Sequence, residues 1–144
     1  EDDKVFVEAI DCQSIRNGND WIIHFLRNAD VQQVVVDGVN GQKILEDAMK
    51  LAKLKPPILP TVREVIQANT LFEQALYQKT IQHRSQPSLF QIVTNCEKRP
   101  IGTQGGFGYK SQYEDYDIAL MESMILAHWA CVEAKEPKKQ KIRY

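Results

Sequence analysis

Apolar residues show two different patterns of spacing along the chain, and the denser pattern predicts strands. Val5–Ile10 is rich in β-branched and aromatic residues, and Val5 and Val7 share one face of the strand that this composition predicts. Val34–Val36 is a continuous apolar run, and Ile58–Leu59 predicts a shorter strand. Because a continuous run has no polar face, Val34–Val36 is typical of a central strand buried on both sides.

Apolar residues at intervals of three and four predict helices in much of the remaining chain. The clearest start is Thr61, since Thr61 and Glu64 have the spacing of a capping box, in which each side chain accepts a hydrogen bond from the other residue's backbone amide. Strands that alternate with helices place the chain in the α/β class. The first predicted helix begins at Asn19 or Asp20, with Ile22, Phe25, Leu26 and Ala29 facing inward, and the second spans about Gln42–Leu54, with Ile44, Leu45, Ala48, Leu51 and Ala52 on one side. The third begins after Thr61, with Val65, Ala68, Phe72, Ala75 and Leu76 on one side. A fourth spans Ser88–Asn95, and the last spans about Asp117–Ala134 with a stripe of Met121, Met124, Ile125, His128, Trp129 and Val132.

The amino-acid composition limits the classes of protein to which this chain can belong. The 144 residues, 43% of them hydrophobic, suffice for one domain with a buried core. No apolar run approaches the roughly 18 to 20 residues of a membrane helix, and the first residues lack the layout of a signal peptide. Three widely spaced cysteines, Cys12, Cys96 and Cys131, argue against a disulfide framework and fit a reducing compartment. A net charge of −1 excludes a generally basic nucleic-acid binder, so any contact with DNA must come from a local arrangement.

Asp37 is the most informative candidate residue. It follows the predicted Val34–Val36 strand and precedes Gly38. A carboxylate at the carboxyl end of a buried strand lies where open α/β sheets usually bind ligands. The alternative is that Asp37 caps the turn at Gly38 through its own side chain, and its position in the sequence leaves both interpretations open.

Acidic residues are crowded at Glu114, Asp115 and Asp117, directly before the last predicted helix. One of these acids can cap that helix and complement its dipole. Crowded carboxylates repel one another unless water or a cation screens them. Binding of Mg²⁺ or Mn²⁺, which prefer carboxylate oxygens, is therefore the second interpretation of this cluster.

The remaining candidates carry weaker signals. The three histidines, His24, His83 and His128, lack zinc-ligand spacing, and His128 is expected to pack in the core. The glycine-rich segment Ile101–Tyr109 predicts a mobile loop or the tip of a hairpin rather than a phosphate-binding loop. Lys110, directly after this segment, could meet a phosphate, and the basic tail after residue 136 is either a solvated end or a phosphate contact.

From Val34 onward, the order of features resembles the C-terminal nuclease domain of tailed-phage large terminase subunits, which has a ribonuclease H-like fold. The series covers about two-thirds of the chain. The series begins with a strand that ends in an acid and a small-residue loop (Val34–Asn40). A helix then leads into a polar segment with a histidine and a Pro–Leu pair (Phe72–Ala75, then Lys79–Leu89). An asparagine follows the next helix (Asn95), and a lysine leads to an acid that opens a small-residue helix (Lys110, then Asp117–Ser123).

This resemblance implies a ribonuclease H-like mixed sheet flanked by helices, in a nuclease domain over residues 1–136 that a basic tail follows at 137–144. In this family, three acids bind two divalent metal ions, Mg²⁺ or Mn²⁺, which activate water for phosphodiester cleavage. Asp37 matches the second acid, and the third matches Asp117 first and Asp115 as the alternative. The first acid belongs to a strand expected upstream of Val5, so the domain is expected to be truncated at its N-terminus and weak or inactive by itself.

The resemblance also implies partners. Double-stranded DNA would be the substrate, with Lys110, His83 and Arg84 in contact with it, in the cytoplasm of the bacterial host. The protein partners would be the terminase ATPase domain, the small terminase subunit and the portal, and no membrane is involved. Two other interpretations stay open: a non-catalytic α/β interaction module whose acids are helix caps, and a transposase or junction resolvase with the same fold.

Overall fold

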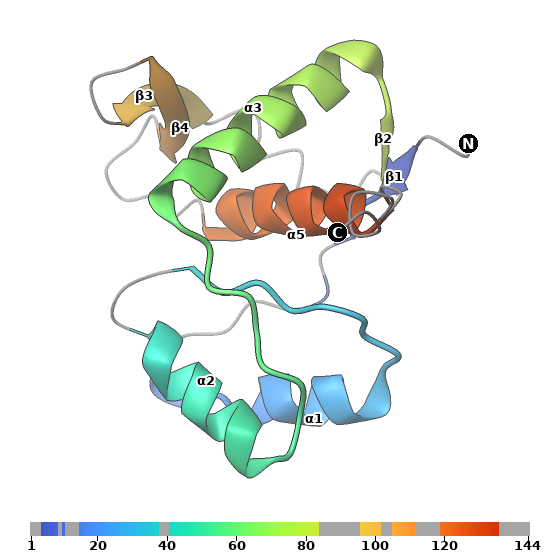
Figure 1. Ribbon diagram of the computed structural model, residues 1–144, viewed down its shortest axis with the longest axis vertical. Helices are drawn as coiled ribbons and strands as arrows, with labels where there is room; N and C mark the ends of the chain where they lie inside the picture. The colour runs from blue at the N-terminus through green and yellow to red at the C-terminus, as the bar shows by residue number, and fades with distance from the viewer. Residues whose placement is uncertain are drawn as a thin grey trace, which may run out of the picture.

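Helices make up most of the described chain, which comprises residues 4–8, 10, 15–37, 41–83, 96–101, 105–111 and 119–135 of the computed structural model. Strands pair within it as two small sheets, so the mixed α/β class predicted from the sequence is confirmed. The elements in Figure 1 are β1 (Val5–Phe6), the 3-10 helix η1 (Ile15–Asn17), α1 (Asp20–Asn28), α2 (Gln42–Leu51), α3 (Val62–Gln78), β2 (Ile81–Gln82), β3 (Cys96–Ile101), β4 (Gly106–Ser111) and α5 (Ala119–Lys135).

The core forms where α3 and α5 pack side by side (Figure 1). The helix α3 contributes Ala68, Phe72 and Ala75, which are buried as the sequence predicts, whereas Leu76, expected on the same side, is exposed and Val65 is half-buried. The capping box at Thr61 is also confirmed, because the Glu64 amide donates to Thr61 Oγ1 at 3.1 Å and the Thr61 amide donates to Glu64 Oε1 at 2.9 Å. Of the predicted stripe on α5, Val132 is half-buried and the other members are buried. The buried residues of α5, which include two outside the stripe, are Met121, Met124, Ile125, Leu126, His128, Trp129 and Ala130.

The first strand, β1, pairs in parallel with β2, which lies far along the chain. The Val5 amide donates to the Thr80 carbonyl and the Val7 amide donates to the Gln82 carbonyl, both at 2.8 Å. Val5 and Val7 are buried on one face, as the sequence predicts. This pair lies beside α5, so residues from the start of the chain complete the core around that helix.

The apolar run Val34–Val36 differs from the expected central strand. It forms a single parallel bridge, in which the Val36 amide donates to the Ile58 carbonyl at 3.0 Å and the Ile58 amide donates to the Val34 carbonyl at 2.7 Å. Its side chains are half-buried rather than covered on both faces, because the described chain supplies a neighbouring segment on one edge only. The bridge confirms strand pairing at Ile58, and the described residues do not assemble a ribonuclease H-like sheet.

The glycine-rich segment forms one arm of a hairpin, so the hairpin alternative is confirmed. The strands β3 and β4 run antiparallel, with Arg99 opposite Gly108 and Ile101 opposite Gly106. Gly105, in the turn, has a φ of +86°, a conformation that favours glycine. The hairpin packs against α3 (Figure 1).

The helices α1 and α2 bury less than the sequence predicts. No residue of α1 is buried, and Asn19 at its start makes no side-chain capping bond. In α2 the buried residues are Leu45 and Met49, whereas Ile44 and Leu51, which were expected to face inward, are largely exposed. Ile44 and Leu45 are adjacent and therefore point in different directions around the helix axis, and tertiary packing buries the side that contains Leu45 and Met49.

Candidate functional site

A small polar cleft lies where α3, α5 and the β3–β4 hairpin meet the end of the Val34–Val36 run. Its volume is about 40 Å³. We call it the Asp37 cleft, and the described residues that line it are Asp37, Val65, Asn69, Arg99, Ile101, Gly108, Tyr109, Glu122, Ile125 and Leu126. It brings the sequence-predicted residue Asp37 next to polar residues from three elements that are distant in the sequence.

Asp37 enters the cleft as the first residue after the bridge-forming run. The Gln42 side chain, at the start of α2, donates through Nε2 to the Val36 carbonyl at 3.0 Å, and this bond fixes the chain directly before Asp37. The Asp37 side chain is exposed. Gly38, through which the turn-capping alternative would operate, lies outside the described residues.

Asn69, in the middle of α3, is the most buried polar group of the cleft. It is 6% exposed, and its Nδ2 donates to the Val65 carbonyl at 2.7 Å. Because the amide nitrogen is bonded to the helix backbone, the Oδ1 carbonyl is the acceptor that this side chain can offer to a ligand. Sequence analysis missed Asn69, since a single asparagine inside an amphipathic helix carries no distinctive signal.

The second carboxylate of the cleft is Glu122, from the first turn of α5. Burial raises the pKa of the Cys96 thiol, and the negative charge of Glu122 raises it further, which places Glu122 close to the start of β3. Asp115 and Asp117, the acids expected here, lie outside the described residues. Within the described chain, no group of three or more histidine, cysteine or acidic residues has the arrangement of a metal site.

The hairpin supplies the positive charge around the cleft. Lys98 Nζ lies 2.7 Å from Glu73 Oε2 and 4.5 Å from the centre of the Phe107 ring. Lys110, the expected phosphate contact, pairs with Glu97 across the hairpin at 3.3 Å and does not line the cleft. Arg99 lines the cleft instead, and sequence analysis overlooked it.

Tyr109 also lies at the cleft, and its phenol stays protonated at neutral pH. Burial, together with the negative charge of Glu73, raises the pKa of Tyr109 to about 12. The Tyr109 ring packs against Phe107 edge to face. Both rings belong to β4, which packs against α3, so Tyr109 is part of the wall that the hairpin gives the cleft.

Of the other predicted DNA contacts, His83 alone is among the described residues. His83 follows β2 directly, is exposed, and is not among the cleft's lining residues. Arg84 lies outside the described residues, as do the predicted helix Ser88–Asn95 and the basic tail. These parts of the prediction therefore stay predictions.

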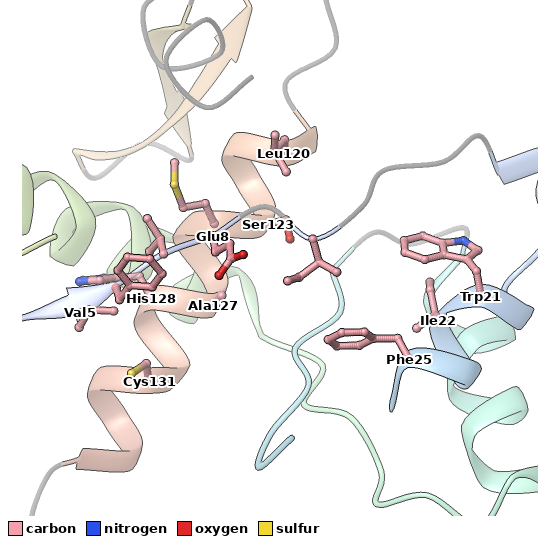
Figure 2. Close-up of a pocket in the computed structure, with 14 residues that line it drawn as sticks. Val5, Glu8, Trp21, Ile22, Phe25, Leu120, Ser123, Ala127, His128 and Cys131 are labelled. Carbon is pink, nitrogen blue, oxygen red and sulfur yellow. The ribbon is translucent and has the colours of Figure 1, made fainter. Parts of the chain in front are cut away.

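A second and larger pocket, of about 460 Å³, is mainly apolar and lies between β1, α1 and α5. Figure 2 shows Ser123, Ala127 and Cys131 of α5 on one side of it and the aromatic residues Trp21 and Phe25 of α1 on the other. His128 also lines this pocket, but burial lowers the pKa of its imidazole. The core role predicted for His128 is confirmed by its exposed fraction of 2%.

No family model, curated protein or solved structure was found to match this chain. The described helices include none with the length and apolar character needed to cross a membrane. The fold and the cleft together define a mixed α/β protein with two carboxylates, a buried amide and an arginine at one small site.

Proposed function

We propose that this chain is part of the nuclease domain of a viral genome-packaging motor, which cuts concatemeric DNA by metal-dependent phosphodiester hydrolysis. The observation that supports the proposal best is the presence of Asp37, Glu122 and Arg99 at one cleft. Carboxylates suit a divalent cation and an arginine suits a phosphate. A site that cleaves a phosphodiester needs both.

The donor set of the cleft fits Mg²⁺ or Mn²⁺ in kind. Carboxylate oxygens of Asp37 and Glu122, together with the Asn69 carbonyl, are hard ligands of the type that these cations prefer. A bound divalent cation would supply an activated water and would stabilise the charge that develops on the phosphate. Asp117, or Asp115 as the alternative, is proposed as the further acid that this site needs.

The proposed ribonuclease H-like sheet would include a strand that precedes β1 and carries another acid. With two described carboxylates, the cleft holds a hydrated cation weakly, because Mg²⁺ keeps several of its own waters when few ligands are offered. We therefore expect weak cleavage, or none, from these 144 residues by themselves. The ATPase domain, the small terminase subunit and the portal are the proposed partners.

The test is metal-dependent cleavage of plasmid DNA by a longer protein that includes the upstream strand. Asp37→Ala should abolish cleavage in Mn²⁺, because it removes a cation ligand and leaves the fold intact at an exposed position. Asp47→Ala is the matched control, since Asp47 is an exposed acid on α2 that pairs with Lys43 outside the cleft. Full cleavage by the Asp37→Ala protein would exclude the proposed function.

A titration of the melting temperature with Mn²⁺ separates this function from a non-catalytic interaction module. A cation that binds only the native state raises the melting temperature by mass action, and Asp37→Ala should remove that rise. An unchanged melting temperature in the longer protein would favour the interaction module. A transposase or resolvase would also bind Mn²⁺, and an ATPase domain encoded directly upstream would argue against both.

A further inference from the structure

Arg99 differs from the neighbouring basic residues of the hairpin in its ion pairing. Lys98 pairs with Glu73 and Lys110 pairs with Glu97, so both lysine charges are matched by a carboxylate. The ion pairs found among the described residues do not include Arg99, although Asp37 and Glu122 line the same cleft. Its guanidinium therefore does not serve to neutralise these acids through a direct contact.

The hairpin holds Arg99 in place at the cleft. Arg99 Nε donates to the Tyr109 carbonyl at 3.4 Å, which occupies one donor of the guanidinium and leaves the two terminal nitrogens. Gly108 lies directly opposite Arg99 in the hairpin register. A Cβ atom at Gly108 would lie 2.9 Å from Ile101 Cδ1, which is too close, and 3.8 Å from Arg99 Nη2, which is an ordinary contact, so glycine leaves the space in which Ile101 lies beside Arg99.

We propose that Arg99 binds a backbone phosphate of DNA at the Asp37 cleft, an inference that rests on the proposed nuclease function. A guanidinium offers a planar pair of donors to phosphate oxygens, which an ammonium group does not. Two carboxylates alone would repel a phosphodiester, and the positive charge of Arg99 at the same cleft offsets that repulsion. Arg99 is thus a substrate-binding residue that places the phosphodiester next to Asp37.

The test measures DNA binding without cleavage. The longer protein is titrated against a fluorescent 20-base-pair duplex in Ca²⁺, and anisotropy is followed at several salt concentrations. Arg99→Gln should weaken binding about tenfold, since a charged hydrogen-bonded contact is lost, and should reduce the slope of log affinity against log salt by about one. Arg99→Lys should recover the salt slope but only part of the affinity, because lysine keeps the charge and loses the planar pair of donors.

Two lysine variants control for the loss of one positive charge. Lys98→Gln removes from the same strand a charge that Glu73 already neutralises, and Lys43→Gln removes from α2 a charge that pairs with Asp47. Neither lysine lines the cleft, so both variants should bind DNA as the parent protein does, and circular dichroism checks that each variant is folded. Equal losses in Arg99→Gln and Lys98→Gln would overturn the inference, because binding would then follow the charge of the whole hairpin.

The outcome for Arg99 is independent of the outcome for Asp37. Parent-like binding by Arg99→Gln, with cleavage still abolished by Asp37→Ala, would overturn this inference alone. Weaker binding by Arg99→Gln, with cleavage unaffected by Asp37→Ala, would overturn the proposed nuclease and leave a phosphate-binding cleft. The two measurements therefore distinguish the two failures.

Discussion

Phe72 of α3 and His128 of α5 meet edge to face in the core, with their ring centres 5.6 Å apart. The imidazole is 2% exposed, and its Nδ1 atom has no hydrogen-bond partner within the described part of the chain. An imidazole in this position packs as an aromatic ring, and a positive charge on it would have to be desolvated. The contact between α3 and α5 is therefore sensitive to pH.

The pH dependence of stability should report this burial. Because burial lowers the pKa of His128, the folded protein binds its proton less readily than the unfolded chain does. The contribution of neutral His128 is complete above the unfolded-state value of about 6.5 and is lost as the pH falls below it. The melting temperature of the parent protein should accordingly decrease between pH 7.5 and pH 5.5.

His128→Phe should flatten this dependence, since phenylalanine keeps an aromatic ring against Phe72 and does not titrate. His24→Gln is the control, because His24 is exposed on α1 and should leave the slope unchanged. Thermal unfolding by circular dichroism at four pH values measures both. A His128→Phe protein with the parent's slope would show that other groups cause the decrease.

Removal of the capping box should destabilise α3. Thr61→Ala loses the hydroxyl that accepts from the Glu64 amide, and the free energy of unfolding should fall by about 1 kcal/mol. Thr70→Ala is the matched control, since Thr70 is exposed within the same helix and alanine has the higher helix propensity. Urea unfolding measures both, and a larger loss in Thr70→Ala would contradict the role of the cap.

Two lysines in left-handed conformation offer stabilising substitutions. Lys53 has a φ of 61° and ends the turn after α2, and Lys79 has a φ of 59° and ends α3. This conformation lets the backbone amide of the next residue close the helix end. After Lys53 the Leu54 amide donates to the Met49 carbonyl, and after Lys79 the Thr80 amide donates to the Ala75 carbonyl.

Glycine adopts this conformation without the steric cost of a Cβ atom, so Lys53→Gly and Lys79→Gly should each raise the free energy of unfolding by about 0.5–1 kcal/mol. Lys50→Gly, inside the last turn of α2, should instead lower it by about 1 kcal/mol. Urea unfolding of the three variants measures these changes in the free energy of unfolding. A loss of stability in Lys79→Gly would show that its side chain makes a stabilising contact.

Gly106 should resist substitution because α3 lies close to it. A Cβ atom there would lie 2.7 Å from Ile66 Cδ1 and 3.2 Å from the Ile101 carbonyl oxygen. Gly106→Ala should cost about 1–3 kcal/mol through overpacking. The double variant Gly106→Ala with Ile66→Val, which removes the nearest atom, should lose less free energy of unfolding than the sum of the losses in the two single variants. Strictly additive losses would contradict the close contact.

Local physics explains which elements were predictable. The capping box needs only Thr61 and Glu64, three residues apart, and its hydrogen bonds form within one helical turn. The apolar spacing in α3 and α5 is regular enough to predict that Phe72, Met121 and Ile125 are buried. On α2 the sequence predicts one apolar side that includes both Ile44 and Leu45, and only Leu45 is buried, because burial depends on which neighbouring elements are present.

By itself, the sequence determined the mixed α/β class, the start of α3 and a loop or hairpin tip in the glycine-rich segment, and it singled out Asp37 as a candidate residue, because each depends on residues that are adjacent or one turn apart. Only the tertiary structure decided that Glu122 and Arg99 join Asp37 at one cleft, and that Lys110 pairs with Glu97 instead. These residues come from segments that share no local pattern. Their meeting is fixed by the packing of α3 against α5 and of the hairpin against α3.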